Sequence, residues 1–401
     1  MAQRTDPEAP TRLCILGLSF AVFAFSEAAA QELAPAPPKQ RGAFMVPMLT
    51  VAEALDDNIL FTQFPESDRV TRVTLGAETG YRSTPFTIDL QAARSADFFE
   101  LHPEFNTGRG RTVAQLATTA LPTRSLTLSM FACYLDTMTP SELNLNSGLT
   151  VGRSLATRVS AAPAFEYRLG SRSSMTGAFP VAHDTIDGRI ADTMTGVAEL
   201  SRRITRRDGL SLRYEHRWFH FYGGPRTERS TADVVMLGWL GEVSDRTILL
   251  LRAGPRYAKG AFTAEILATM KRRINRGLLT LTYSKSQSTT LGKTGALDTQ
   301  SVVGTLAMRV TRNIEIASGP GIYYNSLRGQ RLAAMRLNVE SLWHFADWFH
   351  LGAAYSFDLQ QPDFGAPGHI RRGALVLKLV TSKPQRRPEG PTGEEPMSEM
   401  H

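Results

Sequence analysis

Hydrophobic side chains fall on every second position through most of this 401-residue chain and rarely run together. From Phe349 to Leu359, the odd positions are apolar and the even positions are mostly polar or small. A period of two residues is typical of β-strands that have one apolar face. The pattern therefore predicts a chain built from strands, with an apolar and a polar face on the sheet.

The predicted strands have the length that a tilted strand needs to cross a lipid bilayer. They are residues 45–55, 69–82, 86–98, 109–121, 125–135, 142–153, 156–168, 192–204, 209–222, 230–243, 246–257, 260–272, 277–288, 298–310, 313–325, 330–343, 348–360 and 369–381. The fold class that we predict is all-β, a transmembrane antiparallel up-and-down barrel of about 18 strands, with 16 as the alternative.

The links between these strands favour an even number, because bacterial barrels alternate short periplasmic turns with longer outer loops. Longer links are predicted at 56–68, 99–108, 136–141, 169–191, 223–229, 289–297 and 361–368, and short turns at Ser83–Pro85, Pro122–Arg124, Ser154–Ala156, Arg206–Asp208, Ser244–Arg246, Asn275–Gly277, Arg312–Asn313 and Ala346–Asp347. Short links near 258 and 327 depart from the rule. A strand at Ser174–His183 would make the number odd, so we treat 169–191 as one outer excursion.

The polar face of the predicted strands carries charges of both signs and is expected to line the lumen. The candidate pore-lining residues are Arg72, Glu78, Arg82, Asp89, Glu199, Arg203, Arg213, Glu215, Arg217, Glu265, Arg309, Arg336, Glu340 and Asp358. Mixed charges bias the passage of polar solutes without selecting one ion. The alternative is that these charges only hydrate or brace the interior. A soluble sandwich or propeller would show the same alternation with its apolar face turned into a core.

Aromatic residues favour the membrane interpretation. Tyr214, Trp218 and Tyr222 share the apolar face near one end of their strand, while Trp343 and Phe345 lie near the opposite end of theirs. Rings at the two ends of the strands are expected to form interfacial belts. Ordinary packing of aromatic side chains is the alternative for any one cluster.

The N-terminus has the features of an export signal. Arg4 and Arg12 precede the only sustained apolar stretch, from Leu13 to Phe25, and the small residues Ala28–Ala30 follow it. This stretch is short for a membrane-spanning helix and has the size of a signal-peptide core. We expect a cleaved signal peptide over residues 1–30, a Pro-rich periplasmic lead-in over 31–42, the barrel over 43–381 and a polar disordered tail over 382–401.

Composition narrows the picture further. The mean hydropathy is −0.18, which a protein with several apolar membrane helices could hardly have. After removal of the signal, only Cys133 remains, so no internal disulfide can form. The formal net charge of +7 suits contact with anionic lipid or acidic polysaccharide.

Several motifs have the composition of a chemical site, but each has a simpler explanation. His216 and His220 have a spacing that suits zinc on a helix, but here they lie on a predicted strand and are expected in the aromatic belt. No serine lies in a G-x-S-x-G motif, so we expect no enzymatic activity. The run 202–207 contains four arginines without interleaved aromatics, so a solvated charge cluster is favoured over a nucleic-acid site. We expect no metal and no cofactor.

The segments 54–60 and 66–68, followed by the strand from Val70 to Arg82, resemble the start of the porin-like outer-membrane β-barrels found beside exopolysaccharide and exosortase systems. Those proteins also open with a strand, a D-D-N-I-like turn and an S-D before the next strand. The resemblance implies an outer-membrane barrel without catalytic residues. The chain departs from many such barrels in its last strand, where Leu375, Leu377 and Leu379 stand instead of a terminal aromatic residue.

These observations predict a passive or accessory channel for polar solutes in the bacterial outer membrane, and the resemblance adds a role in export of a surface polysaccharide. The alternative is a structural barrel with a plugged lumen, whose outer loops bind a partner. The expected partners are outer-membrane lipid and lipopolysaccharide, the barrel assembly machinery and polysaccharide export proteins, but no nucleic acid.

Overall fold

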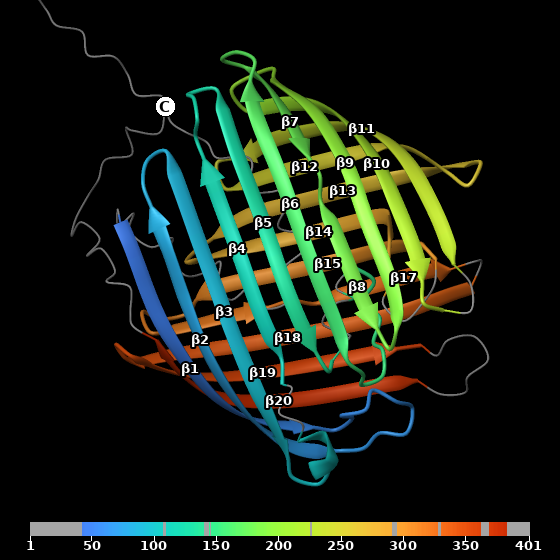
Figure 1. The fold of residues 1–401 in the computed structure, drawn as a ribbon. Helices are drawn as coiled ribbons and strands as arrows, with labels where there is room; N and C mark the ends of the chain where they lie inside the picture. The colour runs from blue at the N-terminus through green and yellow to red at the C-terminus, as the bar shows by residue number, and fades with distance from the viewer. Residues whose placement is uncertain are drawn as a thin grey trace, which may run out of the picture.

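A single antiparallel sheet closes on itself in the computed structural model, because β1 (Gly42–Asp56) pairs with both β2 (Asp68–Arg82) and β20 (Ile370–Ser382) (Figure 1). The structure describes residues 42–382 except 107–109, 140–143, 145, 225–226, 291–294, 328–329 and 362–368. The predicted signal peptide, nearly all of the lead-in and nearly all of the tail lie outside these residues.

The remaining elements follow one another around the barrel in chain order. They are β3 (Phe86–Phe99), the 3-10 helix Pro103–Phe105, β4 (Thr112–Ala120), β5 (Leu126–Thr137), β6 (Ala156–Arg168), β7 (Ser173–Ala178), β8 (Val181–Ile186), β9 (Arg189–Arg203), β10 (Asp208–Tyr222), β11 (Glu228–Ser244), β12 (Thr247–Ala258), β13 (Ala261–Ile274), β14 (Gly277–Ser288), β15 (Leu297–Arg309), β16 (Ile314–Ser318), β17 (Gly321–Leu327), β18 (Gln330–Ala346) and β19 (Phe349–Gln360).

Two pairs of short strands each occupy one position in the barrel. Both β7 and β8 lie between β6 and β9, and both β16 and β17 lie between β15 and β18. Pro180 and Pro320 stand at the two interruptions, where the missing N–H of proline breaks a ladder. The sheet is thus a closed barrel of 18 strands, which confirms the predicted fold class and excludes the alternative of 16.

The predicted number of 18 strands is correct because two errors in the predicted strands compensate each other. The described part of 142–153 contains no strand, and Gly148 has a left-handed φ of 62°, which lies outside the β region. Residues 169–191 are not one outer excursion, since they contain β7 and β8. Together these two short strands span the barrel wall from one end to the other, in the place of one long strand. The predicted strand at 156–168 therefore runs in the opposite direction to the one expected.

The barrel has two distinct ends. Seven of the predicted short turns join strands at the end that holds Gly42 and Ser382, which we name the turn end. The other end, named the loop end, holds most of the longer links. The predicted turn Ser154–Ala156 is wrong, because these residues close a loop-end link that spans 138–155. The links at Lys259–Gly260 and 328–329 are short although they lie at the loop end.

The outward face of the sheet carries large exposed hydrophobic side chains. Met45, Leu75, Leu237 and Phe262 are between 64% and 75% exposed, and each lies on the outward parity of its strand. A water-soluble sandwich or propeller would bury this face in a core. In this barrel the apolar face lies outside and the polar face inside. Within the described residues, no helix has the length and apolar character to span a membrane.

Candidate functional site: the charged lumen and its inward loops

The strand register puts the predicted pore-lining residues on the inner face of the barrel. Residues that face each other on neighbouring strands point to the same side of the sheet, as Arg82 and Thr87 do, and Glu199 and Arg213. The inward-facing positions, which we call the inward parity, can therefore be followed from strand to strand around the barrel. This parity includes Arg72, Glu78, Arg82, Asp89, Glu199, Arg203, Arg213, Glu215, Arg217, Glu265, Arg309, Arg336, Glu340 and Asp358.

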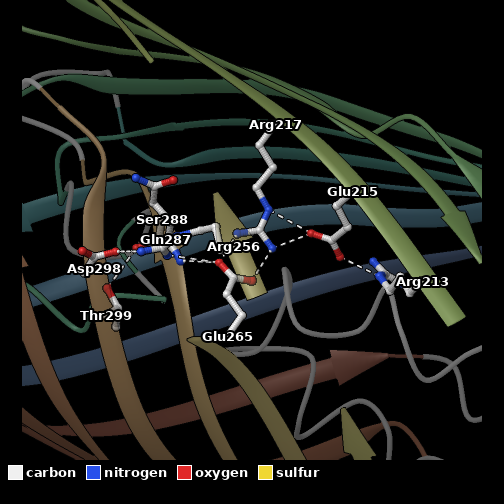
Figure 2. A network of polar contacts seen from close by, with 9 residues as sticks. All are labelled: Arg213, Glu215, Arg217, Arg256, Glu265, Gln287, Ser288, Asp298 and Thr299. Carbon is white, nitrogen blue, oxygen red and sulfur yellow. Dashed lines mark hydrogen bonds and ion pairs between the residues drawn. The ribbon is translucent and has the colours of Figure 1, made fainter. Parts of the chain in front are cut away.

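Eight charged residues from five strands form a continuous chain of ion pairs, which we name the ladder. Figure 2 shows its part from Arg213 to Asp298, and all members but Asp298 lie on the inward parity of their strands. In order, its members are Arg252, Glu199, Arg213, Glu215, Arg217, Glu265, Arg256 and Asp298. Positive and negative side chains alternate, so each buried charge lies next to one of opposite sign. The ladder braces the wall from β9 to β15 without adding net charge to it.

Glu265 is the most enclosed carboxylate of the ladder, with 2% of the residue exposed. It accepts hydrogen bonds from Arg217 at 2.8 and 2.9 Å and from Arg256 at 3.1 Å. Buried carboxylates are tolerated when they are paired in this way. Small inward residues on β11 make room for the long arginines, since a Cβ at Gly238 would lie 3.1 Å from Cγ of Arg252.

A second group of charges crosses the seam where the barrel closes. Arg336 on β18 pairs with Asp358 on β19 at 2.8 Å, and Arg372 on β20 lies 3.5 Å from the same carboxylate. Arg372 also pairs with Asp56 on β1 at 2.7 Å. These contacts join four consecutive strands on the inner face, so they tie the last strands of the chain to the first.

Other predicted residues form local pairs. Arg72 binds Asp97, Arg82 lies between Glu78 and Asp89, Arg309 binds Glu315, and Lys378 binds Glu340. Sequence reasoning had missed the partners Asp97, Glu315 and Lys378, as well as Arg252, Arg256 and Arg372. These partners could have been found from the sequence, because an inward arginine needs an inward carboxylate on a neighbouring strand.

The described part of the link between β5 and β6, residues 138–139, 144 and 146–155, enters the lumen, and we name it the crossing loop. Its Leu149 is 1% exposed and packs against a cluster of inner residues from β15, β17 and β18: Leu297, Tyr323, Leu332 and Ala334. These strands lie about half of the way round the barrel from β5 and β6. The loop therefore reaches from one wall of the lumen to the other.

Polar contacts hold the crossing loop at the far wall. Asn325 of β17 donates to the carbonyl of Ser147 at 2.8 Å, and the Thr150 backbone N–H donates to Oε1 of Gln360 at 2.7 Å. The ring of Tyr323 lies so close to Gly148 that an added Cβ would be 2.3 Å from it. Position 148 thus requires glycine for two reasons: the Tyr323 ring leaves no room for a Cβ, and the backbone φ is left-handed.

Arg153 is the charged side chain in the described part of the crossing loop. Its guanidinium lies 4.5 Å from the ring centroid of Phe99 and 5.3 Å from that of Phe105. No described residue forms an ion pair with it, and its buried Nε atom has no hydrogen-bond partner among them. Burial lowers the pKa of Arg153, but an arginine remains charged at neutral pH. It adds a positive charge that no adjacent pair neutralises.

The D-D-N-I motif fastens the first loop, residues 57–67, to the seam. Asp57 accepts a hydrogen bond from the Gly373 backbone N–H at 2.6 Å, and Asn58 donates to the Arg371 carbonyl at 2.8 Å. Asn58 and Phe61 are buried, and Arg372 stacks on the Phe61 ring. The motif therefore closes the barrel at the loop end instead of forming an exposed turn.

Asp68 of the S-D segment performs a similar role for the next loop. It accepts backbone hydrogen bonds from Arg69, Glu100, Leu101 and His102 and contacts the His102 ring at 2.8 Å. The Asp68 hydrogen bond raises the pKa of His102. The two segments that carry the resemblance, 54–60 and 66–68, thus each hold a loop in place, and we call them clasps.

The predicted belt residues face outward. Tyr214, Trp218 and Tyr222 lie on the outward parity of β10, toward the loop end, and Trp343 and Phe345 lie at the turn end of β18. These positions are the ones that a pair of interfacial belts requires, and the belts stay a prediction.

His216 and His220 also face outward, and His216 contacts Asp233 at 2.6 Å. No group of three potential metal ligands occurs among the described residues. Cys133 faces inward on β5 and is the one free cysteine of that part of the chain.

No protein-family model and no curated protein matches the chain. Several solved structures are similar in shape. OpdO of Pseudomonas aeruginosa has a TM-score of 0.48 at 11% identity, covering 85% of this chain and 97% of that one. OccAB3 of Acinetobacter baumannii has a TM-score of 0.43 at 10% identity, covering 84% and 99%. The siderophore receptor PirA of P. aeruginosa has a TM-score of 0.43 at 8% identity, covering 86% and 81%. At these values the likenesses add nothing to what the sheet itself shows.

Proposed function

We propose that this protein is a passive channel of the bacterial outer membrane, through which small polar solutes diffuse. The observation that carries the proposal is the reversed polarity of the barrel. Its outward face exposes apolar side chains and its inner face holds ion pairs. A closed sheet with this polarity satisfies its backbone and its side chains only when lipid surrounds it.

The crossing loop and Arg153 would set the selectivity of the channel. The paired charges of the ladder and the seam compensate each other, so they offer polar solutes a hydrated wall without strong preference for one sign. Arg153 stands apart from them at the loop that crosses the lumen. We therefore expect a weak preference for anions.

Swelling of vesicles tests this function directly. Proteoliposomes made with the folded protein should swell in isotonic solutions of small uncharged sugars, and the rate should fall as the sugar becomes larger. Vesicles without protein, and vesicles with heat-unfolded protein, serve as controls. Folded protein that leaves the vesicles impermeable to every solute would count against a channel.

A second candidate is a barrel with a filled lumen that serves as a structural or interaction protein. The observation in its favour is that the crossing loop and the first loop meet inside, where the Arg153 backbone N–H donates to the Leu60 carbonyl at 3.4 Å. Impermeable vesicles together with binding of a partner to the outer loops would support it. A link to surface polysaccharide export rests on the sequence resemblance alone.

A further inference from the structure

Two histidines face each other on the inner wall at the turn end of the barrel. His344 on β18 and His350 on β19 are directly opposite in the register, and both lie on the inward parity of their strands. The ladder and the seam contacts include neither residue. We name them the histidine pair.

The two rings of the histidine pair each turn one nitrogen toward the other. Their Nδ1 atoms are 2.8 Å apart, and the ring centroids are 4.5 Å apart at an interplanar angle of 74°. A linear N–H···N hydrogen bond over the same nitrogen distance would put the centroids about 5 Å apart. The ring axes are therefore bent off the line that joins the nitrogens, as they are when two lone pairs are aimed at one shared point.

A metal ion bound to both Nδ1 atoms accounts for these distances. Imidazole nitrogens lie about 2.0 Å from a divalent transition metal, and two such ligands at an angle of about 90° are about 2.8 Å apart. An angle near 90° belongs to the tetragonal geometry of Cu²⁺ and Ni²⁺. Two ligands of a tetrahedral zinc site would lie about 3.3 Å apart. The observed separation thus fits a tetragonal ion without movement of either ring.

Glu315 on β16 favours the tautomer that such a site needs. Its Oε2 atom lies 3.7 Å from Nε2 of His344, while its Oε1 atom accepts hydrogen bonds from Arg309 at 2.8 and 3.1 Å. Nε2 of His344 is buried and has no hydrogen-bond partner among the described residues. A proton on Nε2 that points at this carboxylate leaves the lone pair on Nδ1, the nitrogen that faces His350. Histidines that bind metals are commonly oriented by a carboxylate in this way.

The charges around the histidine pair are compatible with a bound cation. Arg309 and Lys378, on the inner face of the adjoining strands, are paired with Glu315 and Glu340. Neither basic group therefore stands uncompensated beside the site. The His344 side chain is 21% exposed, so water from the lumen can complete the coordination of an ion.

We propose that the histidine pair binds one divalent transition-metal ion with tetragonal coordination, such as Cu²⁺, at the turn end of the lumen. The two Nδ1 atoms are the protein ligands, water fills the remaining positions, and Glu315 is a positioning residue. The described residues contain no group of three ligands, so this is a site with two protein ligands. It needs the folded barrel but does not depend on conduction.

The full-length protein, purified in detergent and free of any polyhistidine tag, tests the site by calorimetric titration with Cu²⁺. Electron paramagnetic resonance of the Cu²⁺-loaded protein reports how many imidazole nitrogens bind the ion. The site variants are His344→Gln and His350→Gln. The matched control is His183→Gln, which removes a histidine from the outward face. All variants should keep heat-modifiable migration on a gel.

We expect the wild type to bind one equivalent of Cu²⁺ and to show couplings from two imidazole nitrogens. Each site variant should lose at least about tenfold in affinity and retain one coupling, while the control changes about twofold or less. Glu315→Gln should weaken binding about tenfold and keep both couplings, because it acts through His344.

The wild-type spectrum decides the matter even if a site variant fails to fold. A spectrum without two imidazole couplings would overturn the site, and so would equal affinity in His350→Gln and His183→Gln. Displacement of Cu²⁺ by millimolar Mg²⁺ would indicate oxygen ligands and would also overturn it. Unchanged binding in Glu315→Gln would remove the positioning role of Glu315.

Discussion

At the scale of single residues, Arg153 is a positive charge at the lumen that forms no ion pair with a described residue. Most of the other inner arginines described above face carboxylates, as Arg217 faces Glu215 and Glu265, so their charges are largely compensated. Arg153 instead stacks on two phenylalanine rings, where its charge is held in place without being neutralised.

Replacement of Arg153 by Gln should reduce the preference of the channel for anions. A unit charge about 8 Å from a passing ion in a medium as polar as water contributes about 0.5 kcal/mol, which is about a twofold change in relative permeability. The reversal potential in a KCl gradient measures the change. Arg153→Lys keeps the charge and should keep the wild-type value. A reversal potential unchanged in Arg153→Gln would remove Arg153 from the selectivity of the channel.

Replacement of Glu265 by Gln should destabilise the barrel strongly, because it leaves Arg217 and Arg256 without their shared carboxylate in a buried position. Breaking one side of a buried ion pair costs about 3–5 kcal/mol. Glu53→Gln is the matched control, since Glu53 pairs with an exposed Arg69 and its loss should cost under about 1 kcal/mol. Heat-induced loss of the fast-migrating gel band compares the two. Equal midpoints would show that the ladder does not brace the wall.

The facing of Glu199, Arg213, Glu215, Arg217 and Glu265 could be predicted because their strands alternate cleanly. Arg252 and Arg256 could not, since the run Leu249–Leu251 puts apolar residues on both faces of β12. No periodic signal could have marked Arg153, because its environment is made by a loop and by rings from elsewhere in the chain.

At the scale of elements, the crossing loop is the segment that sequence reasoning misplaced. Its residues alternate in polarity, as the residues of a strand do, yet the successive residues from Ser147 to Thr150 are all buried. Alternation shows that a segment has two different sides, but it does not show what covers each side. The short strands β7 and β8 show the opposite error, because a loop is predicted where they form part of the sheet. Pro180 interrupts the run of backbone hydrogen bonds between them, but together they still span the barrel wall.

Gly148→Ala should release the crossing loop from the far wall, since its Cβ would collide with the Tyr323 ring. Single-channel recordings should then show a larger or less steady conductance. Gly188→Ala is the control, because Gly188 also has a left-handed φ but has nothing within 4 Å of the added Cβ. If both variants conduct as the wild type does, the crossing loop does not constrict the path.

Asn58→Ala should weaken closure of the barrel. Asn58 is fully buried and its side chain donates to the carbonyls of Thr62 and Arg371 and accepts from the Thr62 backbone N–H. Leaving these groups without partners costs about 2–4 kcal/mol. The midpoint of urea unfolding should fall accordingly. Asn313→Ala, at an exposed turn, should change stability by less than about 0.5 kcal/mol. A similar midpoint for both variants would mean that the D-D-N-I motif is not a clasp.

At the scale of the whole molecule, the closed barrel could be predicted because lipid outside and water inside impose the same two-residue period on nearly every strand. The contents of the lumen could not, because the crossing loop, the first loop and the seam pairs join residues far apart in the chain. Arg372 and Asp56, for instance, lie at opposite ends of the sequence and meet only when the sheet closes.

The proposed channel depends on a path through this partly filled lumen. The measurement that tests it most directly is the current through a planar lipid bilayer after addition of folded, heat-modifiable protein. We predict stepwise increases of conductance in KCl solution, with ion selectivity that depends on Arg153. Folded protein that inserts into the bilayer and produces no conductance steps would contradict the account and favour a barrel with a filled lumen.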